Sequence, residues 1–203
     1  RVPLNWAIIN GETETGVTTF LLNHEIDKGG IIGQVRVPIL PEDNVGTLYE
    51  KLMTTGTSLV TETVDRIAAG DIQPVEQQHI DEATLRPAPK IFKEDCRIDW
   101  EKPGREIVNF VRGLSPYPAA WTEMYREGDD EASSAKIFSA SFEPSAHGEA
   151  SGTLQSDGRT FIRVACADGW IALGELQIAG KKRLAVRELL LGWRDVQQCR
   201  FRK

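Results

Sequence analysis

The chain has 203 residues and a formal net charge of −6, with 40% hydrophobic and 27% charged residues, which is typical of a globular protein with one large or two small domains. We expect no membrane span and no signal peptide, because no apolar run approaches the roughly 18 residues that a bilayer requires. Residues 1–85 hold 5 Lys and Arg against 13 Asp and Glu (−8), and residues 86–203 hold 19 against 17 (+2). The acidic total argues against a protein that coats nucleic acid, but the balance of the second half permits a basic face there.

A short helix and a pair of strands are the first predicted elements. Pro3 suits a first helical turn and Gly11 a helix end, so the apolar residues between them predict a buried helix. Residues 17–22 alternate and residues 31–39 are rich in β-branched side chains, which predicts two strands with Gly33 as a bulge. Because two strands alone are marginally stable, this part looks cut from a longer domain.

The loop between these strands carries a candidate functional carboxylate, Asp27. Gly29 and Gly30 predict a tight turn with positive φ angles and space for a ligand to approach the backbone. A carboxylate on a loop at the rim of a sheet is well placed for chemistry. The competing interpretation is a hairpin turn in which the carboxylate bonds its own backbone, and the loop alone leaves both open.

A long helix and a linker follow. The Glu-Asp-Asn sequence at 42–44 supplies an N-terminal cap, and Gly70 ends the helix. Residues 71–90 contain three prolines and a polar middle, which is typical of a linker that crosses a surface. The apolar side chains that recur at near-helical spacing are Leu48, Leu52, Leu59, Val60, Val64 and Ile67.

The second half of the chain predicts a small β-barrel. A helix over residues 104–114 is stopped by two prolines, and two Asp-Gly pairs further on are hairpin signals. A last helix is predicted over 185–193, and we expect the tail 197–203 to fray. Four short strands are predicted, over residues 120–125, 135–142, 161–165 and 170–178.

Several separated motifs together resemble the methionyl-tRNA formyltransferase family. Residues 14–18 with the Glu-Ile-Asp-x-Gly run at 25–29 look like the end of the family's Rossmann-type domain. The Arg-Ile-Asp-Trp sequence at 97–100 resembles the entry to its C-terminal domain. Residues 112–121 are similar to its Arg-x-x-x-Pro-x-Pro-x-x-Trp signature, and residues 176–182 resemble its final strand and basic turn. The resemblance follows the chain in order.

This resemblance implies an α/β plus β fold. Residues 1–74 would be the C-terminal part of a Rossmann-like formyltransferase domain, 75–95 a linker, and 96–203 an OB-fold-like β-barrel that binds tRNA. The implied enzyme is a formyl transferase of translation initiation, with 10-formyltetrahydrofolate as donor, initiator methionyl-tRNA as acceptor and no metal. We expect a cytoplasmic protein without DNA or membrane partners. The three widely spaced cysteines predict neither disulfides nor a zinc site, which agrees with a reducing, cytoplasmic setting.

The resemblance also assigns roles in the loop. Asp27 matches the Asp that orients or charges a catalytic His, which with the Asn of an Asn-x-His motif stabilises the reaction's oxyanion. Folate contacts would come from His24, Glu25, Ile26 and Gly29. Neither Asn-x-His nor the folate-contacting Ser-Leu-Leu-Pro sequence occurs in the 203 residues, so we expect no transferase activity from this chain alone.

Two basic groups are candidate tRNA contacts. In the resembling family the linker–barrel junction helps to line a positive channel for the acceptor arm, while the basic turn near residue 182 is either a phosphate contact or a solvated hairpin tip. Trp121 and Trp170 are predicted to pack in the core, and Tyr117 to be a packing wedge. The candidate residues are Lys90, Lys93, Arg97, Lys181, Lys182 and Arg183.

Two other functions remain open at this point. One is another formyltransferase or a hydrolase that uses 10-formyltetrahydrofolate, which shares the Asp loop and would be separated by acceptor tests. The other is a non-catalytic RNA-binding barrel module.

Overall fold

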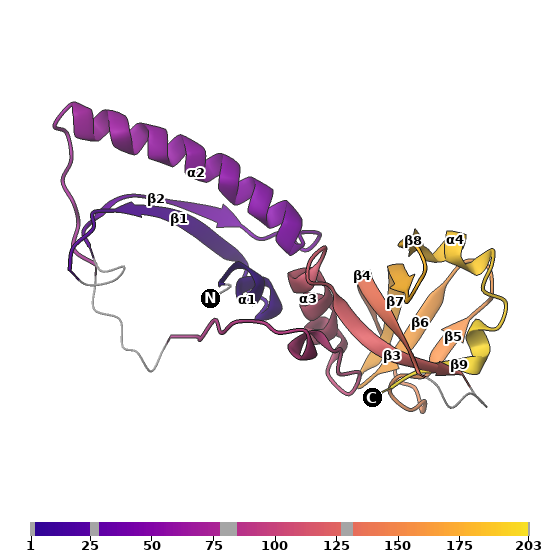
Figure 1. Ribbon diagram of the computed structural model, residues 1–203. Coiled ribbons are helices and arrows are strands. Elements are labelled where there is room, and N and C mark those ends of the chain that lie inside the picture. The colour runs from indigo at the N-terminus through magenta and orange to yellow at the C-terminus, as the bar shows by residue number, and fades with distance from the viewer. Residues whose placement is uncertain (1–2, 25–28, 78–84, 127–131, 203) are drawn as a thin grey trace.

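The computed structural model describes residues 3–24, 29–77, 85–126 and 132–202. The chain forms an elongated first lobe, a β-barrel and a helix between them (Figure 1). Within the described ranges, no helix combines the length and apolar character that crossing a bilayer requires.

The first lobe begins with helix α1 (Pro3–Ile9) and the strands β1 (Glu14–Phe20) and β2 (Ile31–Pro38), as predicted, although β1 ends two residues earlier than expected. Gly11 follows the helix with a φ of 72°. The strands pair in antiparallel fashion, and their register shifts between Thr19, which pairs with Gly33, and Phe20, which pairs with Ile31. Strand β2 therefore has a bulge as predicted, but the extra residue is Ile32, next to Gly33.

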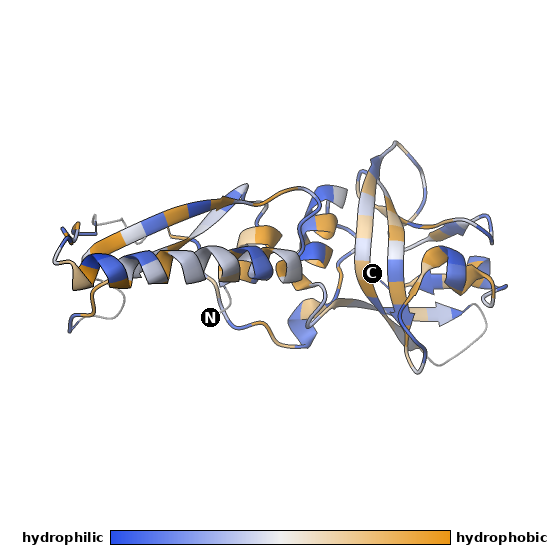
Figure 2. Ribbon diagram, turned by 90° about the horizontal axis from the view of Figure 1, so that it is seen from above, coloured by the Kyte–Doolittle hydropathy of each residue, from blue (hydrophilic) through white to orange (hydrophobic). Residues whose placement is uncertain are grey.

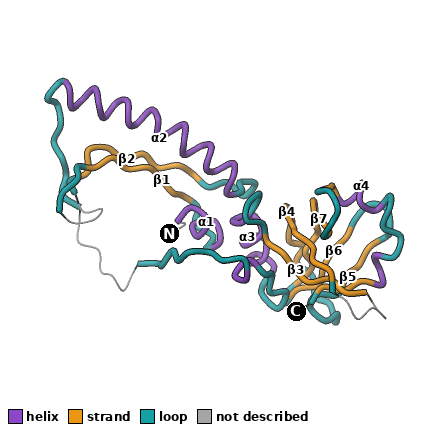
Figure 3. Tube along the Cα trace, viewed as in Figure 1, coloured by secondary structure: helices purple, strands orange, loops and turns teal. Residues whose placement is uncertain are grey.

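Helix α2 (Val45–Ala68), about 36 Å long, runs along this hairpin and extends beyond it (Figure 3). Its N-cap is Asn44, whose side chain accepts a hydrogen bond from the Thr47 amide at 3.0 Å, and Gly70 follows its end with a φ of 69°. Only part of the predicted apolar stripe is buried: Leu48 and Leu59 are, whereas Val60 and Val64 are more than half exposed. Figure 2 shows this mixed hydropathy along the helix.

A buried carboxylate, Asp43, lies just before α2 and links the first turns of this helix to the preceding loop. It accepts hydrogen bonds from Lys51 Nζ at 2.6 Å, the Leu40 amide at 2.8 Å and the Thr47 hydroxyl at 3.0 Å. Burial alone raises the pKa of Asp43, but these hydrogen bonds and the Lys51 charge outweigh burial, so the net pKa lies below its ordinary value.

We expect Asp43→Asn to destabilise the chain in a pH-dependent way. Because the folded-state pKa of Asp43 is depressed, its carboxylate adds stability above the unfolded value of 3.8, and that stability is lost as the pH falls through the folded pKa. The variant should therefore lose free energy of unfolding at pH 7, with a smaller loss at pH 3, as measured by urea denaturation. A difference that does not change with pH would contradict this.

The second half forms the predicted barrel. Its strands follow the order β5-β6-β7-β4-β3-β9, with β8 paired to β7. An isolated bridge between Thr153 and Arg200, and a hydrogen bond of 3.0 Å from the Phe201 amide to the Gly152 carbonyl, join the two edges. The strands are β3 (Ala120–Arg126), β4 (Ser133–Pro144), β5 (Leu154–Ser156), β6 (Ile162–Cys166), β7 (Gly169–Ile178), β8 (Leu184–Ala185) and β9 (Cys199–Phe201).

The prediction of a frayed C-terminal tail is wrong. Strand β9 pairs with β3, and Phe201 is 1% exposed, with its ring stacked on Trp100 at 5.5 Å between centroids. The short strands β5 and β8 were also not anticipated. Helix α4 (Val186–Leu190) is shorter than predicted, and the 3-10 turns η2 (Glu94–Cys96) and η3 (Val196–Gln198) complete the elements.

Helix α3 (Gly104–Leu114), predicted with the same bounds, joins the barrel to the first lobe. Asn5 of α1 donates from Nδ2 to the Gly113 carbonyl at 2.8 Å, and Arg112 donates from its guanidinium to the carbonyls of Leu40 at 3.0 Å and Asp43 at 3.1 Å. A Cβ at Gly113 would lie 2.6 Å from an Ile9 carbon, so glycine permits this close helix contact. The first residues of the 112–121 motif, Arg112 and Gly113, therefore attach α3 to the first lobe.

Candidate functional site

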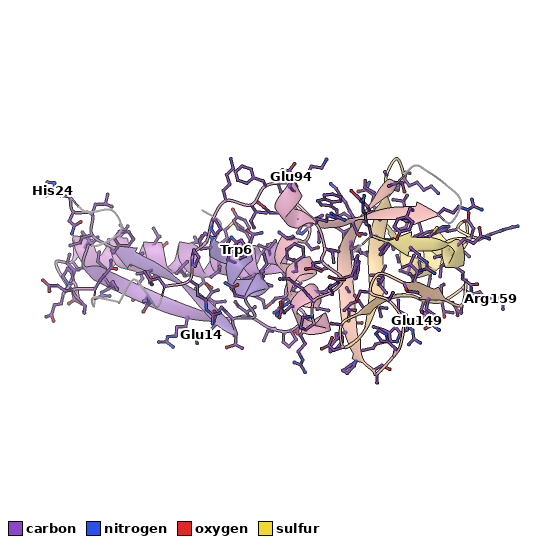
Figure 4. The ribbon with its side chains drawn as sticks, turned by 90° about the horizontal axis from the view of Figure 1, so that it is seen from below. Trp6, Glu14, His24, Glu94, Glu149 and Arg159 are labelled. Atoms are coloured by element: carbon purple, nitrogen blue, oxygen red, sulfur yellow. The ribbon has the colours of Figure 1, made fainter. Side chains whose placement is uncertain are left out.

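The described part of the β1–β2 loop is closed by backbone contacts. The Leu21 amide donates to the Gly30 carbonyl at 2.9 Å, and Gln77 donates from Nε2 to the Gly29 carbonyl at 2.8 Å. His24 is exposed, at the end of the first lobe furthest from the barrel (Figure 4). The candidate residues Glu25, Ile26 and Asp27 lie outside the described residues.

The glycines of this loop have a structural role within the chain. Neither Gly29 nor Gly30 has a positive φ. A Cβ on Gly29 would lie 1.5 Å from the Leu21 carbonyl oxygen, and a Cβ on Gly30 would lie 2.8 Å from Pro74 Cβ. The chain itself approaches the glycine backbone, so these two positions shape the loop.

The linker residue Lys93 lines a pocket beside the barrel, and Lys90 lies next to the Phe92 ring that also lines it. This pocket, termed the linker pocket, has a volume of about 590 Å³, and its lining includes Phe92, Lys93, Tyr117, Trp121 and Lys136. Lys90 Nζ lies 5.1 Å from the centroid of the Phe92 ring. Trp121 donates from Nε1 to the Lys93 carbonyl at 2.7 Å, which ties the linker to β3.

Arg97, the third residue of this basic group, faces elsewhere. It lines a separate cavity of about 220 Å³ with Asp95, Asp99 and Glu106, and its guanidinium lies 3.8 Å from Glu123. Its charge is therefore partly balanced by acids, whereas among the described residues no ion pair involves Lys90 or Lys93.

A row of paired residues connects the linker pocket to the second basic group. Trp121 of β3 pairs with Lys136 of β4, and Lys136 pairs with Gln177 of β7. Directly paired residues have their Cβ atoms about 5 Å apart on one face of a sheet. Gln177 then donates from Nε2 to the Lys181 carbonyl at 2.9 Å, so the row reaches the basic turn.

Within the basic turn, the three cations differ. Lys181 and Lys182 are exposed, and no ion pair within the described ranges involves either of them. Arg183 instead pairs with Glu175, donating from Nε at 2.9 Å, and lies 4.2 Å from the Phe138 ring. Two of the three predicted residues thus present charge to solvent.

Sequence reasoning misjudged or missed part of this surface. Tyr117, predicted as a packing wedge, is 82% exposed, whereas Trp170 is buried as predicted and Trp121 is half-buried. Lys136 and Phe92 were not singled out. The outward position of Lys136 was readable from the strand alternation, but its neighbours depend on the register of β3, β4 and β7. Among the described residues, no cluster of His, Cys, Asp and Glu is arranged to hold a metal ion.

Comparison with known proteins points to one family. Residues 90–194 match the family described as "Formyl transferase, C-terminal domain", and residues 2–64 match "Formyl transferase". Methionyl-tRNA formyltransferase of Bacteroides fragilis is 52% identical over 192 residues, which cover 94% of this chain and 59% of that protein. The chain thus spans less than two thirds of the length of this relative.

Solved structures share the fold. HypX from Aquifex aeolicus in complex with tetrahydrofolic acid is similar with a TM-score of 0.64 and 21% identity, covering 94% of this chain and 32% of HypX. An N-formyltransferase from Helicobacter canadensis, in complex with folinic acid and dTDP-3-aminofucose, has a TM-score of 0.59 and 19% identity, covering 91% and 61%. At these identities the likeness concerns architecture alone: a formyltransferase-type α/β lobe followed by a barrel.

Proposed function

Because the chain belongs to the formyltransferase family, we propose that it is part of an enzyme that moves a formyl group from 10-formyltetrahydrofolate to the amino group of initiator methionyl-tRNA. The relative at 52% identity bears that name, which supports this acceptor over a sugar amine. We place the reaction in the cytoplasm, where charged tRNA is found, without a resident metal. The proposed division is 1–74 for the formyltransferase part, 75–95 for the linker and 96–203 for the tRNA-binding barrel.

The chemistry needs a base, an oxyanion partner and a positioned amine. The amine attacks the formyl carbon, the carbonyl oxygen gains negative charge, and the attacking nitrogen loses a proton. When the carbonyl re-forms, the bond between the formyl carbon and N10 of the donor breaks, and N10 takes up a proton as tetrahydrofolate leaves. We assign Asp27 the role of orienting or charging a histidine that stabilises this oxyanion, and the residues His24, Glu25, Ile26 and Gly29 to the folate side of the loop. The 203 residues contain no Asn-x-His sequence, so the histidine partner is not supplied by that motif within this chain.

The observation that carries the proposal is the separation of two surfaces on one chain. His24, on the β1–β2 loop, lies at one end of the first lobe, whereas Glu94, the neighbour in sequence of the pocket residue Lys93, lies near the barrel (Figure 4). Helix α2, about 36 Å long, spans the first lobe between them. A substrate that reaches from the loop to the barrel must be long, and it must carry phosphates where it meets the lysines of the barrel. A tRNA acceptor arm has both properties.

We expect the 203-residue chain to bind initiator methionyl-tRNA in a salt-sensitive way. Lys90, Lys93, Lys181 and Lys182 present charge, and each lysine that neutralises a phosphate contributes about 1 to the slope of log K against log salt. Titration at two salt concentrations, beside an elongator tRNA, measures this. In the same samples we expect no formylation when 10-formyltetrahydrofolate is added.

Three results would contradict this proposal. Absence of tRNA binding at low salt would remove RNA recognition from this chain. Formyl transfer by the chain alone would show that the motif absent from its sequence is dispensable. Transfer to a nucleotide-sugar amine by a protein of the relatives' full length would replace tRNA by another acceptor.

A further inference from the structure

The linker pocket has a feature that a general basic surface does not require. Two aromatic rings point into solvent at its rim while their backbones are held in place. Phe92 is 55% exposed and Tyr117 is 82% exposed. Large exposed aromatic side chains beside a concave surface are typical of binding sites.

The backbone of Phe92 is fixed on both sides. Its amide donates to Asp95 Oδ2 at 2.8 Å, and its carbonyl accepts a hydrogen bond from the buried Cys96 thiol at 3.2 Å. The Asp95 carboxylate is thereby turned toward the linker backbone, and it lines the smaller cavity instead of the linker pocket. The Phe92 ring is therefore presented by a rigid turn.

The loop that carries Tyr117 is also anchored. The Ala119 amide donates to the Leu114 carbonyl at 2.9 Å, and the Gly46 amide of α2 donates to the Ser115 carbonyl at 3.3 Å. Prolines flank the tyrosine on both sides, which limits its backbone freedom. Because the backbone that carries it is already ordered, little backbone entropy is lost when a flat ligand stacks on the exposed ring.

The charge of the pocket indicates what would stack there. Lys93 and Lys136 line the pocket, and none of the described residues in its lining is an aspartate or a glutamate. Aromatic faces beside lysines are the usual means by which proteins hold single-stranded nucleic acid, because every base has a π-face and every nucleotide a phosphate. A volume of about 590 Å³ is in the range that accepts a small organic ligand.

We propose that the linker pocket binds one unstacked nucleotide of an RNA, with Tyr117 and Phe92 stacking on its base and Lys93 and Lys136 contacting its phosphates. This inference rests on the proposed function, since it names a contact for the same tRNA substrate. Within this surface, the aromatic contacts of Tyr117 and Phe92 contribute little to the salt dependence of binding, whereas the lysines, from Lys136 to Lys181, contact the RNA backbone and carry that dependence.

The test uses the 203-residue chain and two probes: tRNA, and a single-stranded RNA hexamer that carries 2-aminopurine. We expect Tyr117→Ala to weaken hexamer binding about tenfold and to abolish the quenching of 2-aminopurine fluorescence. Tyr117→Phe keeps the ring and should bind within about twofold of the unaltered chain. Because Tyr117 is 82% exposed, its removal leaves the core intact, which circular dichroism verifies.

Further variants separate stacking from charge. Lys136→Gln should lower the salt slope by about 1, whereas Tyr117→Ala and Phe92→Ala should weaken binding with the slope unchanged. If the chain binds tRNA but both aromatic variants bind the hexamer as tightly as the unaltered chain, the pocket proposal is overturned and the proposed function survives. If the unaltered chain binds tRNA but fails to bind the hexamer, the pocket proposal also fails. If the chain binds no tRNA, the proposed function fails.

Discussion

Replacing Trp100 with alanine is expected to lower the free energy of unfolding of the barrel by about 3–5 kcal/mol. The indole is fully buried, stacks on Phe201 at 5.5 Å and donates from Nε1 to Thr122 Oγ1 at 3.0 Å. The Phe201 amide donates to the Gly152 carbonyl at 3.0 Å, which is one of the contacts that close the barrel. The Trp100 ring, stacked on Phe201, therefore supports the seam between the two edges of the sheet. Its removal leaves a large cavity at this seam and a hydroxyl that loses its donor.

Trp100→Phe serves as the matched control for this prediction. A phenyl ring preserves most of the stacking and removes the indole hydrogen bond, so the expected loss is about 1 kcal/mol. Both variants are measured by chemical denaturation, followed through the fluorescence of the four tryptophans that remain. Equal unfolding midpoints for Trp100→Ala and the unaltered chain would show that the seam does not depend on this contact.

The elements with local signals were predictable from the sequence. The cap at Asn44 and the stop at Gly70 bound α2, and the bounds of α3 followed from its apolar face and the two prolines after it. These signals act within a turn or two of the chain. Strand β9 carries no such signal, because its stability comes from pairing with β3 across the barrel. A polar tail and an edge strand look alike until the partner is known.

The candidate site divides along the same line. Residue types alone identified Lys93, Lys181 and Lys182 as candidate phosphate contacts. They did not reveal that Arg183 pairs with Glu175, or that Lys136 connects the two basic groups, because both depend on which strands are neighbours. Tyr117 was misjudged for a related reason: flanking prolines indicate a rigid loop, but the direction of the ring depends on how that loop packs on the first lobe.

Replacing Gly29 with alanine is expected to lower the free energy of unfolding by about 2–3 kcal/mol. A Cβ at this position would lie 1.5 Å from the Leu21 carbonyl oxygen, so the backbone must move apart. The movement breaks the hydrogen bonds from Leu21 to Gly30 and from Gln77 to Gly29, each worth about 1 kcal/mol, and adds strain. Urea denaturation measures the loss, and faster hydrogen exchange at the Leu21 amide would locate it.

Gly56→Ala is the matched control, because the same substitution should have the opposite sign there. Gly56 lies inside α2, and its new Cβ would meet Val17 at an ordinary 3.6 Å, so the chain gains helix propensity of about 1 kcal/mol without a clash. If Gly29→Ala is as stable as Gly56→Ala, the close approach of Leu21 does not hold the loop. The requirement for glycine would then come from a ligand that approaches the backbone, as the sequence first indicated. A clash with Leu21 lowers the free energy of unfolding of the ligand-free chain, whereas a clash with a ligand leaves it unchanged.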